Sequence, residues 1–275
     1  MKENIEKTIL RINHKPTSDF EGLSPFEMDK LLYDTFGQES PVKLLKLKDE
    51  TYTNIPILNQ MLFFGDILKK EGELKLTNKG YLPTRIVADL YYNGFLKDVI
   101  IETGIHKLYK ETDSNVVNLT RILAELTLLT KKRNGRLSLT KSGEKLLEDK
   151  EKLLKLIFKT FGEKFKWAYY DGYGDNFIGQ LGYGFSLYLL SKYGDKKRFN
   201  VFYAAKYFKA FPTLLSNMGD YRYNFISSAE CCYSTRTFDR FLYYFGLIEM
   251  QKEDPILSHK FYLKKTKLFD QLISC

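Results

Sequence analysis

A short pattern occurs twice in this chain and constrains its fold more than any other feature. Residues 74–80 read Leu-Lys-Leu-Thr-Asn-Lys-Gly, and residues 137–143 read Leu-Ser-Leu-Thr-Lys-Ser-Gly. In both copies two leucines alternate with polar residues, as in a half-buried strand, and the following threonine can cap a helix. A recurring strand-to-helix junction indicates repeated supersecondary units. The sequence therefore predicts tandem copies of one small fold.

Helical patterns precede the first copy. A capping box at Ser24 and Glu27 begins one helix, and weaker helix starts follow at Ser40 and Asn54. The third of these helices carries Asn59 and Gln60, which we expect to be exposed. After it, the alternation over residues 67–77 around a glycine predicts a short β-hairpin.

The second copy has the stronger hairpin signal. Asn134-Gly135 is a favoured two-residue turn, here between strands expected over 127–132 and 136–140. The helix before it has apolar residues at helical spacing over 119–126. A third, degraded copy follows near residues 238–266, where a phenylalanine stripe, a glycine, a strand and a threonine come in the same order.

Three helices followed by a hairpin is the order of winged helix-turn-helix domains, which the chain resembles most directly over residues 20–93. This resemblance implies a mostly α fold with small β-hairpins, an α+β class, built from tandem winged-helix-like units. In such domains the third helix is the recognition helix and the hairpin is the wing. As a whole, the chain resembles uncharacterised bacterial proteins with a Gly-Leu-Ser-Pro start (22–25) and an Asp-Gly-Tyr aromatic centre (171–173), a resemblance that names no activity.

The patterns divide the chain into segments. We expect an N-terminal helical segment at 1–19, winged-helix-like units at 20–93, 94–160 and 212–275, and an aromatic-rich helical segment at 161–211. The aromatic side chains are expected to form core or to pack domains together, since they bury large areas. Stacking of single-stranded bases stays open only where Lys164, Lys166 and Lys206 line one face.

Charge points to a nucleic-acid partner. The 275 residues carry a formal net charge of +9, and four cations gather at the tip of the second hairpin. Cations there can lie along a phosphate backbone, while arginines on the preceding helices can reach a groove. We expect Asn118, Thr120 and Thr237 to be exposed beside these arginines. The candidate nucleic-acid-binding residues are Lys131, Lys132, Arg133, Arg136, Arg121, Arg236 and Arg240.

Catalytic patterns are weak. The three histidines are scattered, and the sequence has neither a phosphate-binding loop nor paired metal-ligand spacing. Asp171 and Asp175 could hold a cation, but aspartate with glycine is typical of turns. We therefore expect no enzyme, cofactor or metal. The predicted function is non-enzymatic binding of duplex DNA with a regulatory role, and the alternative is a protein-interaction or scaffold module, including a homo-oligomer.

Three cysteines are too few and too badly placed for a disulfide framework, which fits a reducing compartment. The first residues lack the apolar run of a signal peptide, and the most apolar stretch, 178–190, is too short to cross a bilayer. The sequence predicts a cytoplasmic protein without a membrane partner.

Overall fold

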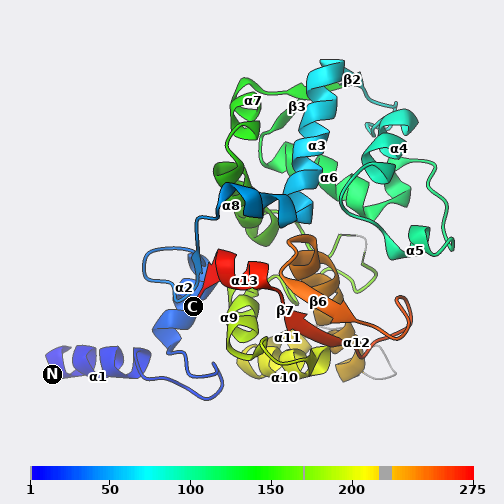
Figure 1. Ribbon diagram of the computed structural model, residues 1–275. Coiled ribbons are helices and arrows are strands. Elements are labelled where there is room, and N and C mark those ends of the chain that lie inside the picture. The colour runs from blue at the N-terminus through cyan, green and yellow to red at the C-terminus, as the bar shows by residue number, and fades with distance from the viewer. Residues whose placement is uncertain (1, 170, 217–224) are drawn as a thin grey trace.

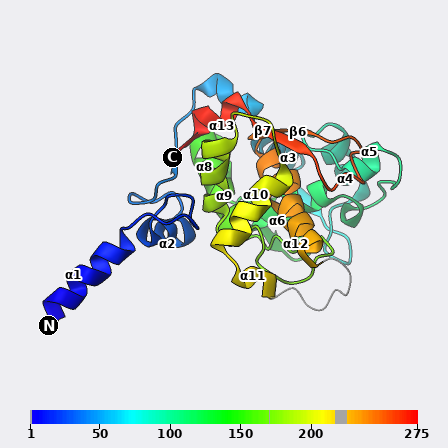
Figure 2. The ribbon, with the colours of Figure 1, turned by 90° about the horizontal axis from the view of Figure 1, so that it is seen from below.

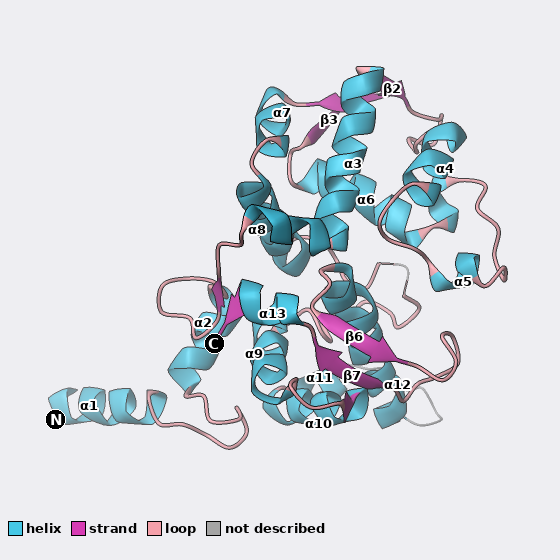
Figure 3. Cartoon of the chain, viewed as in Figure 1, coloured by secondary structure: helices cyan, strands magenta, loops and turns pink. Residues whose placement is uncertain are grey.

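The computed structural model describes residues 2–169, 171–216 and 225–275, and Figure 1 shows their arrangement. Within these ranges the chain is mostly helical, and its strands form three small antiparallel sheets (Figure 3). The predicted α+β class is confirmed. Residues 217–224 of the predicted segment 212–275 lie outside the described residues.

The N-terminal part contains the first predicted helix start. α1 (Lys2–Asn13) extends away from the body of the molecule in Figures 1 and 2 and leads to α2 (Pro25–Tyr33). The Ser24 amide donates to Glu27 Oε2 at 2.7 Å, and the Glu27 amide donates to Ser24 Oγ at 3.3 Å. The expected capping box is therefore present.

The helix expected to begin at Ser40 is not formed. The Ser40 hydroxyl donates to the Thr35 carbonyl at 2.6 Å and accepts from the Val42 amide at 3.2 Å, which fixes a turn. Beyond this turn, β1 (Lys43–Leu44) pairs with β8 (Ile273–Ser274) at the other end of the chain. This partner cannot be seen in the local pattern. η1 (Asp49–Asn54), a short 3-10 helix, follows.

Residues 56–139, called here the N-terminal unit, build the first three-stranded sheet. Its strands lie in the order β2–β4–β3, so that the first strand neighbours the last. The elements of this unit are α3 (Pro56–Glu71), β2 (Glu73–Lys75), α4 (Thr84–Tyr92), α5 (Val99–Glu102), η2 (Glu111–Asp113), α6 (Asn115–Leu126), β3 (Thr130–Arg133) and β4 (Arg136–Leu139).

The hairpin predicted over residues 67–77 is not formed. Ile67 and Leu68 are buried in the last turns of α3, which ends at Gly72 with a φ of +73°. The chain then enters β2, whose Leu74 lies opposite Leu137 of β4. Because a three-residue strand cannot bury its leucine alone, it pairs with a strand about sixty residues away. The predicted segments 20–93 and 94–160 therefore share one sheet.

Residues 183–265, the C-terminal unit, build a second three-stranded sheet in the order β5–β7–β6. α7 (Lys141–Leu147) and α8 (Lys150–Glu163) connect it to the N-terminal unit. Its elements and those that follow are α9 (Tyr183–Tyr193), β5 (Arg198–Phe199), α10 (Asn200–Ala210), α11 (Thr213–Ser216), α12 (Phe225–Ser234), the π-helical η3 (Thr235–Leu242), β6 (Ile248–Gln251), β7 (Tyr262–Lys265), α13 (Lys267–Leu272) and β8.

Both units share one order of main elements: helix, strand, helix, helix, strand, strand, with the first strand beside the last. In each, a threonine after the final strand caps a helix. Thr140 Oγ1 accepts from the Gly143 amide at 2.8 Å, and Thr266 Oγ1 accepts from the Phe269 amide at 3.3 Å. Thr77 instead accepts from the Tyr81 amide within a turn. The helix cap expected at Thr77 is therefore wrong.

The aromatic segment forms core between the two units, as the sequence predicts. Trp167 is buried, and its indole N–H donates to the Phe161 carbonyl at 2.7 Å. Phe158 of α8 packs against Phe241 and Phe245, with ring centroids 5.3 and 4.2 Å apart. These rings join the helix that leaves the N-terminal unit to the third helix of the C-terminal unit.

Candidate nucleic-acid interface

The β3–β4 hairpin aligns cations across the first sheet. Its turn residues Asn134 and Gly135 have φ values of +49° and +69°, the left-handed pair of a type I′ turn. This two-residue turn sets Arg133 opposite Arg136, and β2 adds Lys75 on the other side of Arg136. Paired residues of an antiparallel sheet point to the same face. Three cations therefore stand in one row across three strands.

The next row on this exposed face lies two residues along each strand. It consists of Lys131, Ser138 and Glu73. Glu73 forms an ion pair with Arg136, and both side chains are about half exposed. Lys75, Lys131 and Arg133 are exposed, and no ion pair reaches them from the described part of the chain. Four cations against one carboxylate leave this face, called here the cationic sheet face, with a formal charge of +3.

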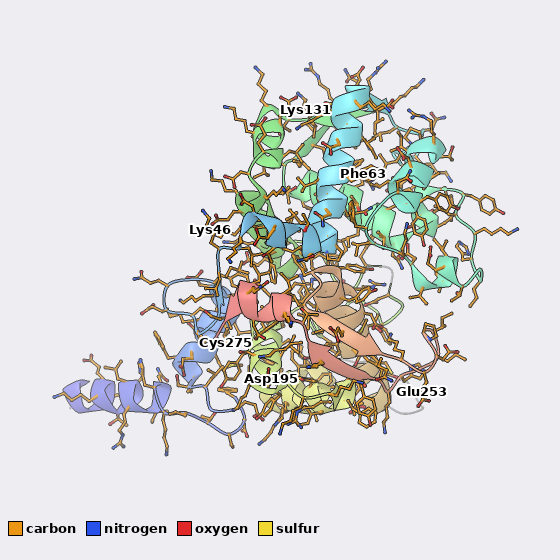
Figure 4. All side chains as sticks on the ribbon, in the orientation of Figure 1. Lys46, Phe63, Lys131, Asp195, Glu253 and Cys275 are labelled. Carbon is orange, nitrogen blue, oxygen red and sulfur yellow. The ribbon has the colours of Figure 1, made fainter. Side chains whose placement is uncertain are left out.

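The four predicted hairpin cations do not all lie together. Lys131, Arg133 and Arg136 share the cationic sheet face, and Lys131 is labelled at the upper edge of the molecule in Figure 4. Lys132 stands opposite Leu137, in the row that points to the other face. Its ammonium group lies against Gly80, where an added Cβ would come within 2.6 Å of it. Lys75 is a member of the face that sequence analysis missed.

The second sheet has a different exposed face. Glu249 stands opposite Lys264, and Gln251 stands opposite Tyr262. The Tyr262 ring stacks on Phe199 with centroids 4.0 Å apart. The exposed face of the C-terminal sheet is therefore mixed in charge and partly aromatic. Of the two sheets with this strand order, the N-terminal one has the cationic face.

The polar residues expected to be exposed on α6 are buried. The Asn118 amide donates to Glu111 Oε1 at 2.7 Å, and the Thr120 hydroxyl donates to the Val116 carbonyl at 2.7 Å. Arg121 is largely buried, its Nε donates to Glu111 Oε1 at 2.6 Å, and it also pairs with Glu125. Burial lowers the pKa of Arg121, but these carboxylates outweigh it and raise the pKa overall. Glu111 of η2 therefore holds the side chains of Asn118 and Arg121 within the protein.

The expectation for α3 fails at Gln60, whereas Asn59 is half-buried. Gln60 is fully buried, where its Nε2 donates to the Leu90 carbonyl and its Oε1 accepts from the Phe95 amide at 2.6 Å. Asn59 donates to the Thr53 carbonyl at 2.7 Å. α3 is the first helix of the N-terminal unit, whereas the sequence patterns predict it as the third helix of the unit 20–93.

Arg236 is fully buried, at 0% exposure, and Thr237 beside it is also buried. The expectation that both residues lie on a solvent-exposed helix face is therefore wrong. Arg236 forms an ion pair with the buried Asp171. The prediction assumed 3.6 residues per turn, and the π-helical turns of η3 change which residues share a face. Its guanidinium also donates to the carbonyls of Gly174, Asn176 and Ile178 and to Asn176 Oδ1.

The remaining candidates from the sequence are Arg240 and the two aspartates, Asp171 and Asp175. Arg240 is partly buried, and its Nη1 donates to the Tyr169 carbonyl at 2.9 Å. Asp171 is occupied by Arg236, while the exposed Asp175 accepts from Lys166 Nζ at 2.6 Å. Across residues 2–169, 171–216 and 225–275, no group of three or more histidine, cysteine, aspartate or glutamate side chains could hold a metal ion.

Comparisons with protein-family models, with curated proteins and with solved structures found no match. Among the helices that the structure describes, none combines the length and the apolar character needed to cross a bilayer. The geometry of the cationic sheet face is therefore the main guide to function.

Proposed function

We propose that the protein binds nucleic-acid duplexes, without catalysis, through contacts between phosphates and the cationic sheet face. The observation that carries this proposal is the row of Lys75, Arg136 and Arg133 across three adjacent strands. Like charges directly opposite each other destabilise a sheet. A polyanion would reverse the sign of this contribution, and guanidinium groups suit phosphate in particular.

The order of elements supports the resemblance to winged helix-turn-helix domains. α3, α4 and α6 are followed by the β3–β4 hairpin, which takes the position of a wing. The predicted contact residues of α6, Asn118, Thr120 and Arg121, are held within the protein, so the hairpin and β2 would supply the contacts. Phosphate contacts position a protein on the duplex but carry no sequence information. We therefore expect similar affinity for duplexes of equal length and different sequence.

A pair of charge-matched variants tests this proposal. Duplex affinity is measured by fluorescence anisotropy at 0.1 M salt for Lys131→Ala with Arg133→Ala, and for the control Lys264→Ala with Lys267→Ala. Both double variants lose two exposed cations, but the control loses them from the C-terminal part. Each phosphate contact raises the association constant roughly eightfold at this salt concentration, so the hairpin variant, which loses two contacts, should bind about 60-fold more weakly. Equal weakening by both variants would show a non-specific charge effect and refute the proposal.

A second candidate, self-association, is favoured by one surface. On the projecting helix α1, Ile5, Ile9 and Ile12 are all exposed at helical spacing. An antiparallel pairing of two α1 helices would set Ile5 opposite Ile12 and Glu6 opposite Arg11. Sedimentation at 0.5 M salt tests this: a dimer that is lost in Ile9→Glu supports it, and a native monomer rejects it.

A further inference from the structure

A cleft lies between the two units, away from the cationic sheet face. It has a volume of about 670 Å³ and is lined by α5 and the residues around it, by η3 and Tyr243–Tyr244, and by the start of the β6–β7 connection. In Figure 1, α5 stands above that connection at the right of the molecule. Small-molecule sites commonly enclose about 300–1,000 Å³. The cleft is therefore of suitable size for such a guest.

Part of the cleft wall is apolar although it meets solvent. Val99 and Ile100 of α5, Tyr243 after η3 and Ile256 of the β6–β7 connection all line it and are all exposed. Exposed apolar residues scattered singly need no explanation, but a concave group from three elements marks a binding surface. Transfer of this surface from water to an apolar guest is favourable.

Tyr244 provides a polar group at this site. The residue is only 7% exposed, and its hydroxyl meets no hydrogen-bond partner among the residues that the structure describes. Burial raises the pKa of Tyr244, and the nearby carboxylates of Asp98 and Asp239 raise it further. The hydroxyl therefore stays protonated and can donate a hydrogen bond to a guest.

The charged groups of the lining balance and have partners inside the protein. Asp98 accepts from the Ser114 hydroxyl, Asp239 pairs with Lys252 at 2.7 Å, and Arg240 donates to the Tyr169 carbonyl. Lys97 donates to the Tyr92 carbonyl, and Glu102 accepts from the Tyr91 hydroxyl. Three cations and three carboxylates leave no net charge to attract a phosphate-bearing guest.

We propose that this cleft is a binding site for an uncharged, planar aromatic small molecule, which packs between Tyr243, Ile100 and Ile256 and accepts a hydrogen bond from Tyr244. The cationic sheet face contributes no residue to the cleft. The proposal is therefore independent of duplex binding.

Titration with Nile red, an uncharged planar dye with carbonyl and ring-nitrogen acceptors, tests the proposal by its fluorescence. We expect saturable binding with one site per chain. Tyr244→Phe should weaken binding about fivefold, as expected for one lost hydrogen bond. Ile256→Glu should weaken it at least about tenfold, because the dye would strip water from a carboxylate. The control Leu257→Glu changes the next residue, which is 72% exposed and does not line the cleft, and should bind like the native chain.

Hydrogen exchange measured by mass spectrometry locates the dye without any variant. Bound dye should slow exchange in 97–103 and 250–256, and leave 130–136 unchanged. Four results would each overturn the proposal. They are slower exchange only outside 97–103 and 250–256, the absence of saturable binding, binding by Ile256→Glu as tight as by the native chain, and equally tight binding of the anionic dye 8-anilinonaphthalene-1-sulfonate.

Discussion

Replacement of Arg236 by methionine tests how the third helix of the C-terminal unit is held. In the native chain this fully buried guanidinium neutralises the buried Asp171 and fills the carbonyl acceptors of Gly174, Asn176 and Ile178. Arg236→Met keeps much of the side-chain volume but leaves the carboxylate without a counter-charge. Breaking a buried ion pair from one side costs about 3–5 kcal/mol. A buried carbonyl left unpaired, such as that of Ile178, adds about 1 kcal/mol.

The expected loss is therefore about 4–6 kcal/mol, a large share of the 5–15 kcal/mol that stabilises a typical domain. Urea denaturation followed by circular dichroism measures it. The exposed Arg133→Met serves as the control and should change the free energy of unfolding by less than about 0.5 kcal/mol. In the double variant with Asp171→Asn, part of the loss should be recovered, because no buried charge remains. A loss below about 1 kcal/mol in Arg236→Met, or additive effects in the double variant, would refute this reasoning.

Two further predictions concern local contacts. Burial raises the pKa of Glu21, but hydrogen bonds from Lys206 and Tyr193 outweigh it and hold that pKa below its ordinary value of 4.5. This lowered pKa contributes stability at pH values above 4.5, and that contribution is lost as the pH falls through the pKa of Glu21 in the folded protein. The urea midpoint of Glu21→Gln should therefore fall less steeply below pH 4.5 than that of the native chain. Parallel curves would contradict this. Gly135→Ala should cost about 1–2 kcal/mol, because φ is +69° there, and an unchanged urea midpoint would show that the turn relaxes freely.

Local signals in the sequence predicted elements correctly where neighbouring residues determine the structure. The capping box at Ser24 and the Asn134-Gly135 turn each depend on residues that lie within four positions of each other. The aromatic core around Trp167 was also predicted, because large apolar side chains are buried wherever the fold permits.

The errors arise where the partner is distant in sequence. Ile67 and Leu68 fit a strand as well as a buried helix, and only β4 shows which strand β2 joins. Arg236 fits an exposed helix face until the loop from Asp171 to Ile178 folds over it. Glu111, which fixes Asn118 and Arg121, belongs to no motif. Pairing across the fold also placed Lys75 beside Arg136, and this row could not be read from either repeat alone.

The salt dependence of duplex binding tests the central claim, phosphate contact by the cationic sheet face, most directly. With three to four phosphates contacted, the logarithm of the association constant should fall against the logarithm of salt concentration with a slope of about −2.7 to −3.6. Loss of Lys131 and Arg133 should bring this slope closer to zero by about 1.8. A flat dependence in the native chain, or an unchanged slope in the double variant, would contradict the account.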